Sequence, residues 1–202
     1  MASRTAHALT LAVPLLVVLA GCGGDVVGDA GLAFEDWYPE DVSPPPGTRY
    51  PCALTALPRE LPGIPAGERA FVNHAYALVL DATHAKLELL RDVDTDAFAA
   101  LAAYEARVGE VIERLESEAP PDGLGRFRDD VIDAIRLQRE AFALAVHDSA
   151  EGAGRAVFGR PEAREASRRL IRAWGAMKAR YPRASKELAD SAYHHLCALD
   201  LF

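Results

Sequence analysis

From residue 66 onward, apolar residues recur every three or four positions, the spacing of one buried face of an α-helix. Two such faces fit between residues 66 and 119, where there is no proline. Residues 92–96 contain three aspartates and a threonine, which favour helix caps and first turns, so one helix is predicted to end near Arg91 and the next to begin near Asp96. The two faces are Phe71, Ala75, Leu78, Ala82, Ala85 and Leu89, and then Phe98, Leu101, Val108, Ile112 and Leu115.

The same spacing continues after a Pro-Pro-Asp-Gly turn at residues 120–123. A third helix is predicted to stop at Gly152 and Gly154, and a fourth to open at Pro161, because proline is tolerated in a first turn. Pro182 indicates either a kink or a fifth helix over about residues 182–199, and we favour the fifth helix. The three faces are Leu124, Phe127, Val131, Ile135, Phe142 and Ala145; Ala163, Leu170, Trp174, Met177 and Tyr181; and Leu188, Ala192, Leu196 and Leu199. The prediction is an all-α fold, an antiparallel up-down bundle of four to five helices over residues 66–202.

Residues 22–65 have a different composition. Residues 23–47 contain six acidic and no basic side chains, which is typical of a disordered to irregular tether. Four prolines in residues 48–65 exclude a long helix there, so this part is expected to wrap irregularly around the bundle. Three aromatic residues, Phe34, Trp37 and Tyr38, leave three interpretations open: docking on the bundle, binding to a partner, or exposure.

The N-terminus carries a short basic region with Arg4, an apolar run from Ala8 to Ala20, and the stretch Leu19-Ala20-Gly21-Cys22. Residues 1–22 resemble the signal peptide and lipobox of bacterial lipoproteins. The resemblance implies that residues 1–21 are removed, that Cys22 receives a diacylglycerol on its sulfur, and that its new amino group is acylated, for example with palmitate. It also implies a protein fastened to the cell membrane or outer membrane, facing the periplasm or the exterior.

Charge is unevenly distributed along the chain. The formal net charge is −8 and becomes −9 when residues 1–21, with Arg4 as their one charge, are removed, so a nucleic-acid partner is not expected. Between Arg160 and Lys186, nine basic residues face two glutamates, a local balance of +7. Arg164, Arg168 and Arg172 recur every four residues and predict one exposed ridge. It is either an ordinary solvated face or a docking site for the acidic tether, an anionic partner or lipid headgroups.

Export would place the two remaining cysteines, Cys52 and Cys197, in an oxidising compartment. We expect an intramolecular disulfide, and a pair of buried free thiols or an intermolecular bridge are the alternatives. The 145 positions between the two residues form a long loop, whose closure stabilises a fold by about 5 kcal/mol in the chain-entropy model.

Histidines and carboxylates suggest a second function. On the first helix His74, Asp81, His84 and Glu88 share one stripe, and Asp81 and His84 have the i,i+3 spacing of carboxylate-bridged metal bundles. This stripe lies away from the apolar face, so a solvated surface is the simpler interpretation. His147 with His194 or His195 is a further zinc- or copper-binding group to consider. A metal-binding bundle is therefore the alternative function.

Short catalytic motifs are missing from the sequence: there is no Gly-x-Ser-x-Gly, His-Glu-x-x-His, haem-attachment or phosphate-loop pattern. Gln138 and Glu105 interrupt the apolar faces of their helices and indicate either a polar layer that fixes helix register or a small polar pocket. The expected function is a non-catalytic binding or assembly module, without a cofactor apart from the lipid on Cys22.

Overall fold

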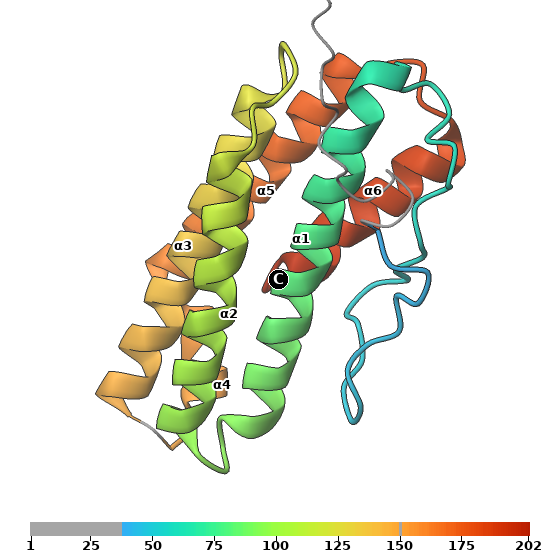
Figure 1. The fold of residues 1–202 in the computed structure, drawn as a ribbon. Helices are drawn as coiled ribbons and strands as arrows, with labels where there is room; N and C mark the ends of the chain where they lie inside the picture. The colour runs from blue at the N-terminus through green and yellow to red at the C-terminus, as the bar shows by residue number, and fades with distance from the viewer. Residues whose placement is uncertain (1–37, 150) are drawn as a thin grey trace, which may run out of the picture. The chain divides into compact units, whose positions relative to one another are not determined.

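The computed structural model describes residues 38–149 and 151–202. This part of the chain forms six α-helices and one short 3-10 helix, and no strand (Figure 1). The helices are α1 (Ala66–Asp92), α2 (Ala97–Ser117), α3 (Gly125–Asp148), α4 (Ala153–Ala156), α5 (Pro161–Arg180) and α6 (Lys186–Leu199), with the 3-10 helix η2 (Val157–Gly159). The predicted signal peptide, Cys22 and the tether as far as residue 37 lie outside the described residues.

Local signals set most helix ends where they were predicted. The Asp96 carboxylate accepts a hydrogen bond from the Ala99 backbone N–H at 3.1 Å and caps α2. Pro161 is the first residue of α5. The fifth long helix is confirmed, and it begins after Pro182, where the Ser185 hydroxyl caps it. The number of helices differs from the prediction in one place. The glycine-rich link after α3 contains two additional single turns, α4 and η2.

The five long helices alternate in direction, as Figure 1 shows. Helix α1 packs on α2, α2 on α3 and α3 on α5, while α6 packs on α1 and α5. The fully buried Phe127, Ile135 and Phe142 of α3 lie in the middle of this arrangement, which is the predicted antiparallel bundle. Within the described residues, no helix is long and apolar enough to cross a membrane.

Helix α1 is more enclosed than its sequence predicted. Fifteen of its residues are buried, because α2 covers one side while α6 and residues 38–65 cover another. The solvated stripe expected there was wrong: His74 is buried, and Asp81, His84 and Glu88 are half-buried. The prediction for Phe98 was wrong in the opposite sense. It was expected on the buried face of the second helix, but it is 58 % exposed at the start of α2.

Residues 38–65, which we call the arm, contain no helix and pack on the bundle. Leu57, Leu61 and Ile64 are buried in the common core. Gly63 lies at φ +91°, and a Cβ on it would be 2.7 Å from the Cα of Ala184 in the loop between α5 and α6. Glycine is therefore required where the arm touches this loop. Irregular wrapping was predicted, and the structure shows that this segment belongs to the folded body.

A polar centre lies between α1, α3 and the end of α6. Lys86 of α1 is 2 % exposed, and its ammonium donates hydrogen bonds to the carbonyls of Ala198, Leu199 and Asp200 at 2.6, 3.1 and 2.6 Å. The amide of Gln138, from α3, donates to the Leu199 carbonyl at 2.8 Å. A cation at a helix C-terminus is favourable for the helix dipole, and these donors satisfy carbonyls that the helix leaves free.

Burial lowers the pKa of Lys86 to about 8, and the carboxylate of Asp200 opposes this shift. The amine therefore stays largely protonated at neutral pH, which suits three carbonyl acceptors. Gln138 takes the role of a register-fixing polar layer, whereas Glu105 is only half-buried.

Replacing Lys86 by methionine tests this centre. Lys86→Met leaves the α6 carbonyls without charged donors, so we expect a loss of about 3 kcal/mol in the free energy of unfolding, measured by urea denaturation at pH 7. The same substitution at exposed Lys178 on α5 should change stability by less than about 0.5 kcal/mol. Equal effects of the two substitutions would contradict a structural role for the buried amine.

Candidate functional site

The outer side of α5 combines positive charge with exposed apolar surface. Arg164, Arg168, Ile171 and Lys178 fall on one stripe because they are spaced by four, three and seven residues. Ile171 is 66 % exposed, the highest value among the exposed large apolar residues of the described part of the chain. A single exposed apolar side chain is ordinary on a protein surface, so the interest of this stripe depends on whether further apolar side chains lie beside it.

Two aromatic rings extend this stripe towards α6. Trp174 of α5 and Tyr193 of α6 have ring centroids 5.7 Å apart, and Tyr193 is 47 % exposed. The Lys178 ammonium lies 5.9 Å from the centre of the Trp174 ring, within range of a cation–π contact. We call the whole surface the basic–aromatic face, and it consists of Arg164, Arg168, Ile171, Trp174, Lys178 and Tyr193.

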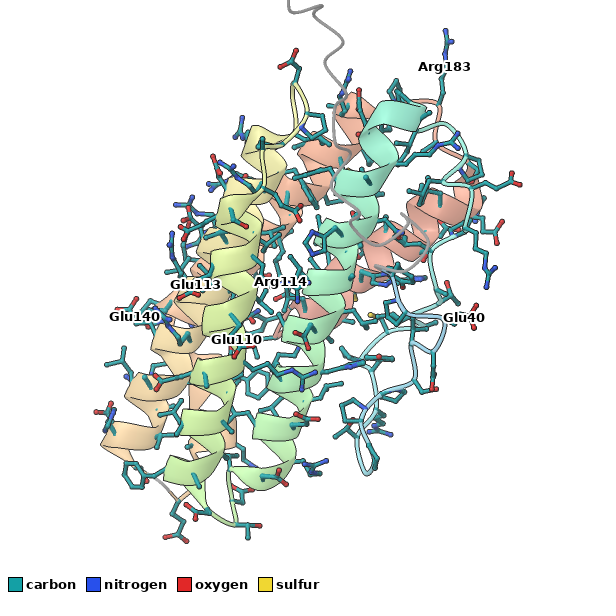
Figure 2. All side chains as sticks on the ribbon, viewed as in Figure 1. Glu40, Glu110, Glu113, Arg114, Glu140 and Arg183 are labelled. Atoms are coloured by element: carbon teal, nitrogen blue, oxygen red, sulfur yellow. The ribbon has the colours of Figure 1, made fainter. Side chains whose placement is uncertain are left out.

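The charges of the basic–aromatic face are only partly neutralised. Arg168 pairs with Glu165 at 2.7 Å, whereas Arg164 donates to the backbone carbonyl of Gly159. Among the residues that the structure describes, neither Arg164 nor Lys178 has a carboxylate partner within 4 Å. A different surface is acidic: Glu110 and Glu113 of α2 and Glu140 of α3 project outward in Figure 2.

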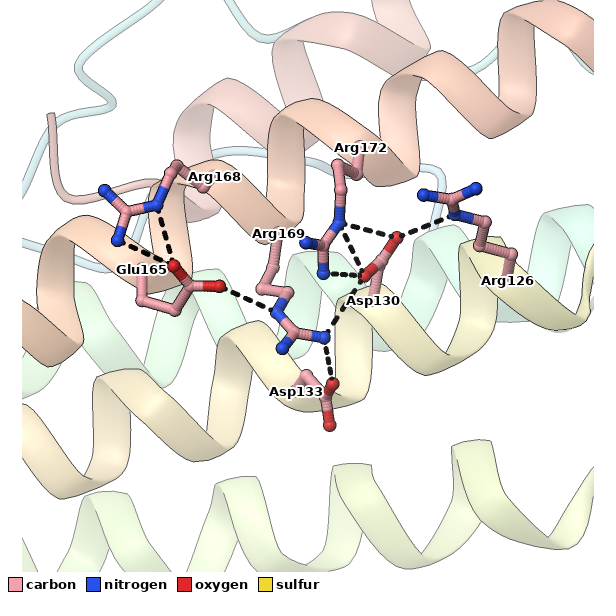
Figure 3. A network of polar contacts seen from close by, with 7 residues as sticks. All are labelled: Arg126, Asp130, Asp133, Glu165, Arg168, Arg169 and Arg172. Carbon is pink, nitrogen blue, oxygen red and sulfur yellow. Dashed lines mark hydrogen bonds and ion pairs between the residues drawn. The ribbon is translucent and has the colours of Figure 1, made fainter.

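Arg172 does not belong to the exposed ridge that the sequence predicted. Its guanidinium turns toward α3 and binds the carboxylate of Asp130 at 2.6 Å (Figure 3). Asp130 is 4 % exposed and also faces Arg169 at 3.5 Å and Arg126 at 3.8 Å. Arg169 in turn pairs with Asp133 at 2.5 Å. The every-fourth-residue spacing was misleading here, because a helical step of four rotates a side chain by about 40°.

This network fastens α5 to α3 and is therefore structural. Four arginines, at 126, 168, 169 and 172, face Asp130, Asp133 and Glu165 within it. The pairing holds the pKa of Arg172 above its usual value through its hydrogen bond to Asp130. The predicted ridge thus has two roles, since Arg172 packs the helix while Arg164 and Arg168 face solvent.

Asp130→Asn tests the structural role. Removing this buried charge leaves three arginines facing one another, and since these are partly solvated we expect a loss of about 2 kcal/mol in unfolding free energy. Asp129→Asn, on the exposed side of the same helix, should cost less than about 0.5 kcal/mol. Thermal or urea denaturation of both variants makes the comparison, and similar losses would show that burial of Asp130 is unimportant.

The structure does not bring the stripe of His74, Asp81, His84 and Glu88 together as a site. Asp81 and Glu88 hold Arg107 of α2 at 2.5 and 2.9 Å. His84 donates from Nε2 to the Tyr50 hydroxyl at 2.6 Å, because that hydroxyl itself donates to the Val42 carbonyl. Nε2 of His74 accepts from Arg114 at 3.0 Å, and its Nδ1 contacts Glu118.

His195 is fully buried and fixes the arm. Its Nδ1 donates to the Ser191 carbonyl at 2.8 Å, so its Nε2 accepts a hydrogen bond of 2.6 Å from the Tyr38 hydroxyl. Tyr38 thus docks on the bundle, while Phe34 and Trp37 lie outside the described residues. The exposed His147 packs against the Phe98 ring, 6.0 Å between centroids, and His194 packs against Tyr193. The predicted cluster of His147 with His194 or His195 does not form, and the described residues contain no group of three or more potential metal ligands.

Burial makes the folded protein sensitive to acid. Desolvation lowers the pKa of His74 and His195 to about 4, from about 6.5, and also lowers that of His84. Between pH 6.5 and 4 the unfolded chain binds protons that the folded chain does not, so stability falls as the pH falls through this window.

Each histidine adds at most about 1.4 kcal/mol per pH unit to this dependence. We expect His195→Gln to reduce the slope of unfolding free energy against pH, measured by urea denaturation between about pH 4 and 7. His147→Gln, which replaces an exposed side chain, serves as the control and should leave the slope unchanged. An unaltered slope in His195→Gln would rule out this residue as the source.

Cys52 and Cys197 lie side by side as two thiols, so the predicted disulfide is not formed in this structure. The Cys52 thiol donates to the carbonyl of His194 at 3.3 Å. Both residues are half-buried at the contact between the arm and α6.

The chain matches no family model, and no curated protein or solved structure is similar to it. The sequence did not predict that Ile171 and Tyr193 belong to the basic–aromatic face. It also did not predict that Arg169 belongs to the ion-pair network that holds α5 on α3. Ile171 had a detectable signal, because it lies seven residues after Arg164 and so shares its face. Tyr193 had none, since its neighbour Trp174 is on another helix.

Proposed function

We propose that this protein is an exported lipoprotein, fastened to a membrane through Cys22, whose helical bundle is a non-catalytic binding module. The resemblance of residues 1–22 to a lipobox supports the anchor. The basic–aromatic face supports the binding role, and it is the observation that carries the proposal. Its ligand is the anionic headgroup region of the membrane that holds the lipid.

Three properties of the face suit a membrane interface. Arg164 and Lys178 offer uncompensated positive charge, and each such residue near an anionic bilayer contributes about 1 kcal/mol. Trp174 and Tyr193 are amphipathic rings of the type that gathers at headgroup level. Ile171 adds apolar area that can enter the boundary with the acyl chains.

The geometry of the chain is compatible with this arrangement. Fifteen residues, 23–37, separate Cys22 from the docked arm, and a chain of this length would reach about 45 Å as polyproline II or about 20 Å as a flexible coil. Either length lets the bundle turn its α5 side towards the lipid. In this arrangement the lipid anchor supplies affinity for the membrane, and the basic–aromatic face sets the orientation of the bundle on it.

The first test separates the anchor from the face. Cys22→Ser in the full chain should move the protein from the membrane to the soluble fraction, and mass spectrometry should find acyl groups on the unaltered protein only. Retention of the serine variant in membranes, together with an unmodified wild-type mass, would contradict the lipoprotein assignment.

The second test uses lipid vesicles and the mature chain carrying the Cys22→Ser substitution. Binding should require phosphatidylglycerol, should be absent with phosphatidylcholine alone, and should weaken with salt. Arg164→Glu with Lys178→Glu should reduce affinity at least about 25-fold at low salt, at about fivefold for each positive charge removed. The control is Arg49→Glu with Arg59→Glu, which reverses two exposed charges of the arm and should retain more of the binding. Equal loss in both variants, or no vesicle binding at all, would overturn this use of the face.

A further inference from the structure

The contact between Cys52 and Cys197 lies where the arm crosses α6. The Cys52 thiol donates a hydrogen bond of 3.3 Å to the backbone carbonyl of His194, one turn before Cys197 on α6, and the Cys197 thiol is its neighbour. These two residues are the only cysteines that would remain after lipidation of Cys22. The fold thus brings together two thiols that are 145 positions apart.

Other contacts keep the arm in register on α6 around this pair. The Ser191 hydroxyl is 2.7 Å from the Thr55 carbonyl and 3.1 Å from that of Ala56. On the other side, the Tyr38 hydroxyl donates to His195 at 2.6 Å. Residues 191, 194, 195 and 197 of α6 therefore hold arm residues before and after Cys52. Because this register is set by hydrogen bonds outside the pair, the thiols stay in contact without a covalent bond.

We propose that Cys52 and Cys197 form a redox latch, an intramolecular disulfide that fixes the arm to α6 in the exported protein. The bond forms by thiol–disulfide exchange with a protein disulfide oxidant. Each cysteine loses its proton, one S–S bond forms between them, and the two electrons reduce the oxidant's disulfide to two thiols. The latch rests on the proposed function in one respect, since export supplies the oxidising compartment.

The surroundings of the pair determine how the latch closes. Burial raises the pKa of the Cys52 thiol to about 12, and the ammonium of Lys86 opposes this shift only weakly. The thiolate that attacks a disulfide is therefore scarce at neutral pH, so closure in the folded protein is slow without an oxidising catalyst. Half-burial also hinders small reductants once the bond exists.

The position of the latch gives it a mechanical role. The arm continues directly into the tether that leads to Cys22, so any pull between membrane and bundle enters the domain through the arm. In the reduced protein this load falls on hydrogen bonds at Tyr38, Tyr50 and Ser191. In the oxidised protein a covalent bond carries it into α6, whose end is held by buried Lys86.

Peptide mapping of the full chain tests the latch. The protein is extracted from membranes with its thiols blocked by N-ethylmaleimide in denaturant, and then digested with trypsin without reductant. We expect residues 50–59 joined to residues 187–202, and two separate peptides after reduction. Recovery of the two peptides apart, each carrying the alkyl group, or a bridge between two copies, would overturn the proposal.

A second measurement tests the geometry independently of export. The purified mature chain carrying Cys22→Ser is reduced and placed in a glutathione redox buffer with a disulfide oxidoreductase as catalyst, where the same linked peptide should form. Failure to form it would refute the geometry of the latch, whereas failure of the lipoprotein assignment shows separately as a missing acyl group on Cys22 of the unaltered protein.

Variants then test the effect on the arm. Cys197→Ser should speed tryptic cleavage after Arg49 and Arg59 at least about tenfold relative to the oxidised protein, and reduction of the wild type should do the same. Ser191→Ala weakens a neighbouring arm contact but should keep the linked peptide. Cleavage rates that do not depend on the oxidation state would show that the bond does not restrain the arm.

Discussion

The structure depends on one buried charge. Lys86 lies about two turns before the end of α1, and its ammonium donates hydrogen bonds to three carbonyls at the C-terminus of α6. An isolated ammonium in an apolar interior is costly, and it is tolerated here because each of its N–H groups has an acceptor and the α6 dipole is favourable. Gln138 joins from α3 at the same carbonyl end, so three helices are fixed in register by one polar centre.

The arm depends on that arrangement. Its contacts are mostly to α6, through Ser191, His195 and the cysteine pair, with a further contact from Tyr50 to His84 of α1. A movement of α6 would break most of the hydrogen bonds that hold the arm. The arm and the bundle thus form one cooperative unit. The contacts Tyr38–His195 and Tyr50–His84 are part of the interface between them. Burial lowers the pKa values of His84 and His195, so protonation of these rings in acid is expected to weaken the two contacts.

Electrostatics divides helix α5 into two sides. On the side towards α3, arginines form ion pairs with buried Asp130 and half-buried Asp133, and these pairs hold the two helices together. Away from α3, Arg164 and Lys178 are left to solvent beside Ile171 and the rings of Trp174 and Tyr193. Nine basic residues lie in and around α5, and the carboxylates on α3 are too few to pair with all of them. Some of the basic side chains therefore remain exposed to solvent. The basic–aromatic face is the part of α5 that these acidic partners do not cover, and it combines the remaining positive charge with exposed apolar side chains.

The sequence by itself determined the helices, their order and most of their ends, because periodic apolar residues, capping aspartates and prolines act over only a few positions. It also indicated that residues 23–47 are acidic and differ from the bundle. Only the tertiary structure decided which second face of α1 is buried, where Lys86 finds its acceptors, and that Arg172 turns inward while Ile171 stays exposed. The physical reason is the same in each case: periodicity identifies one buried face of a helix, whereas these choices depend on partners that lie 19 to 114 positions away and meet only when the chain packs.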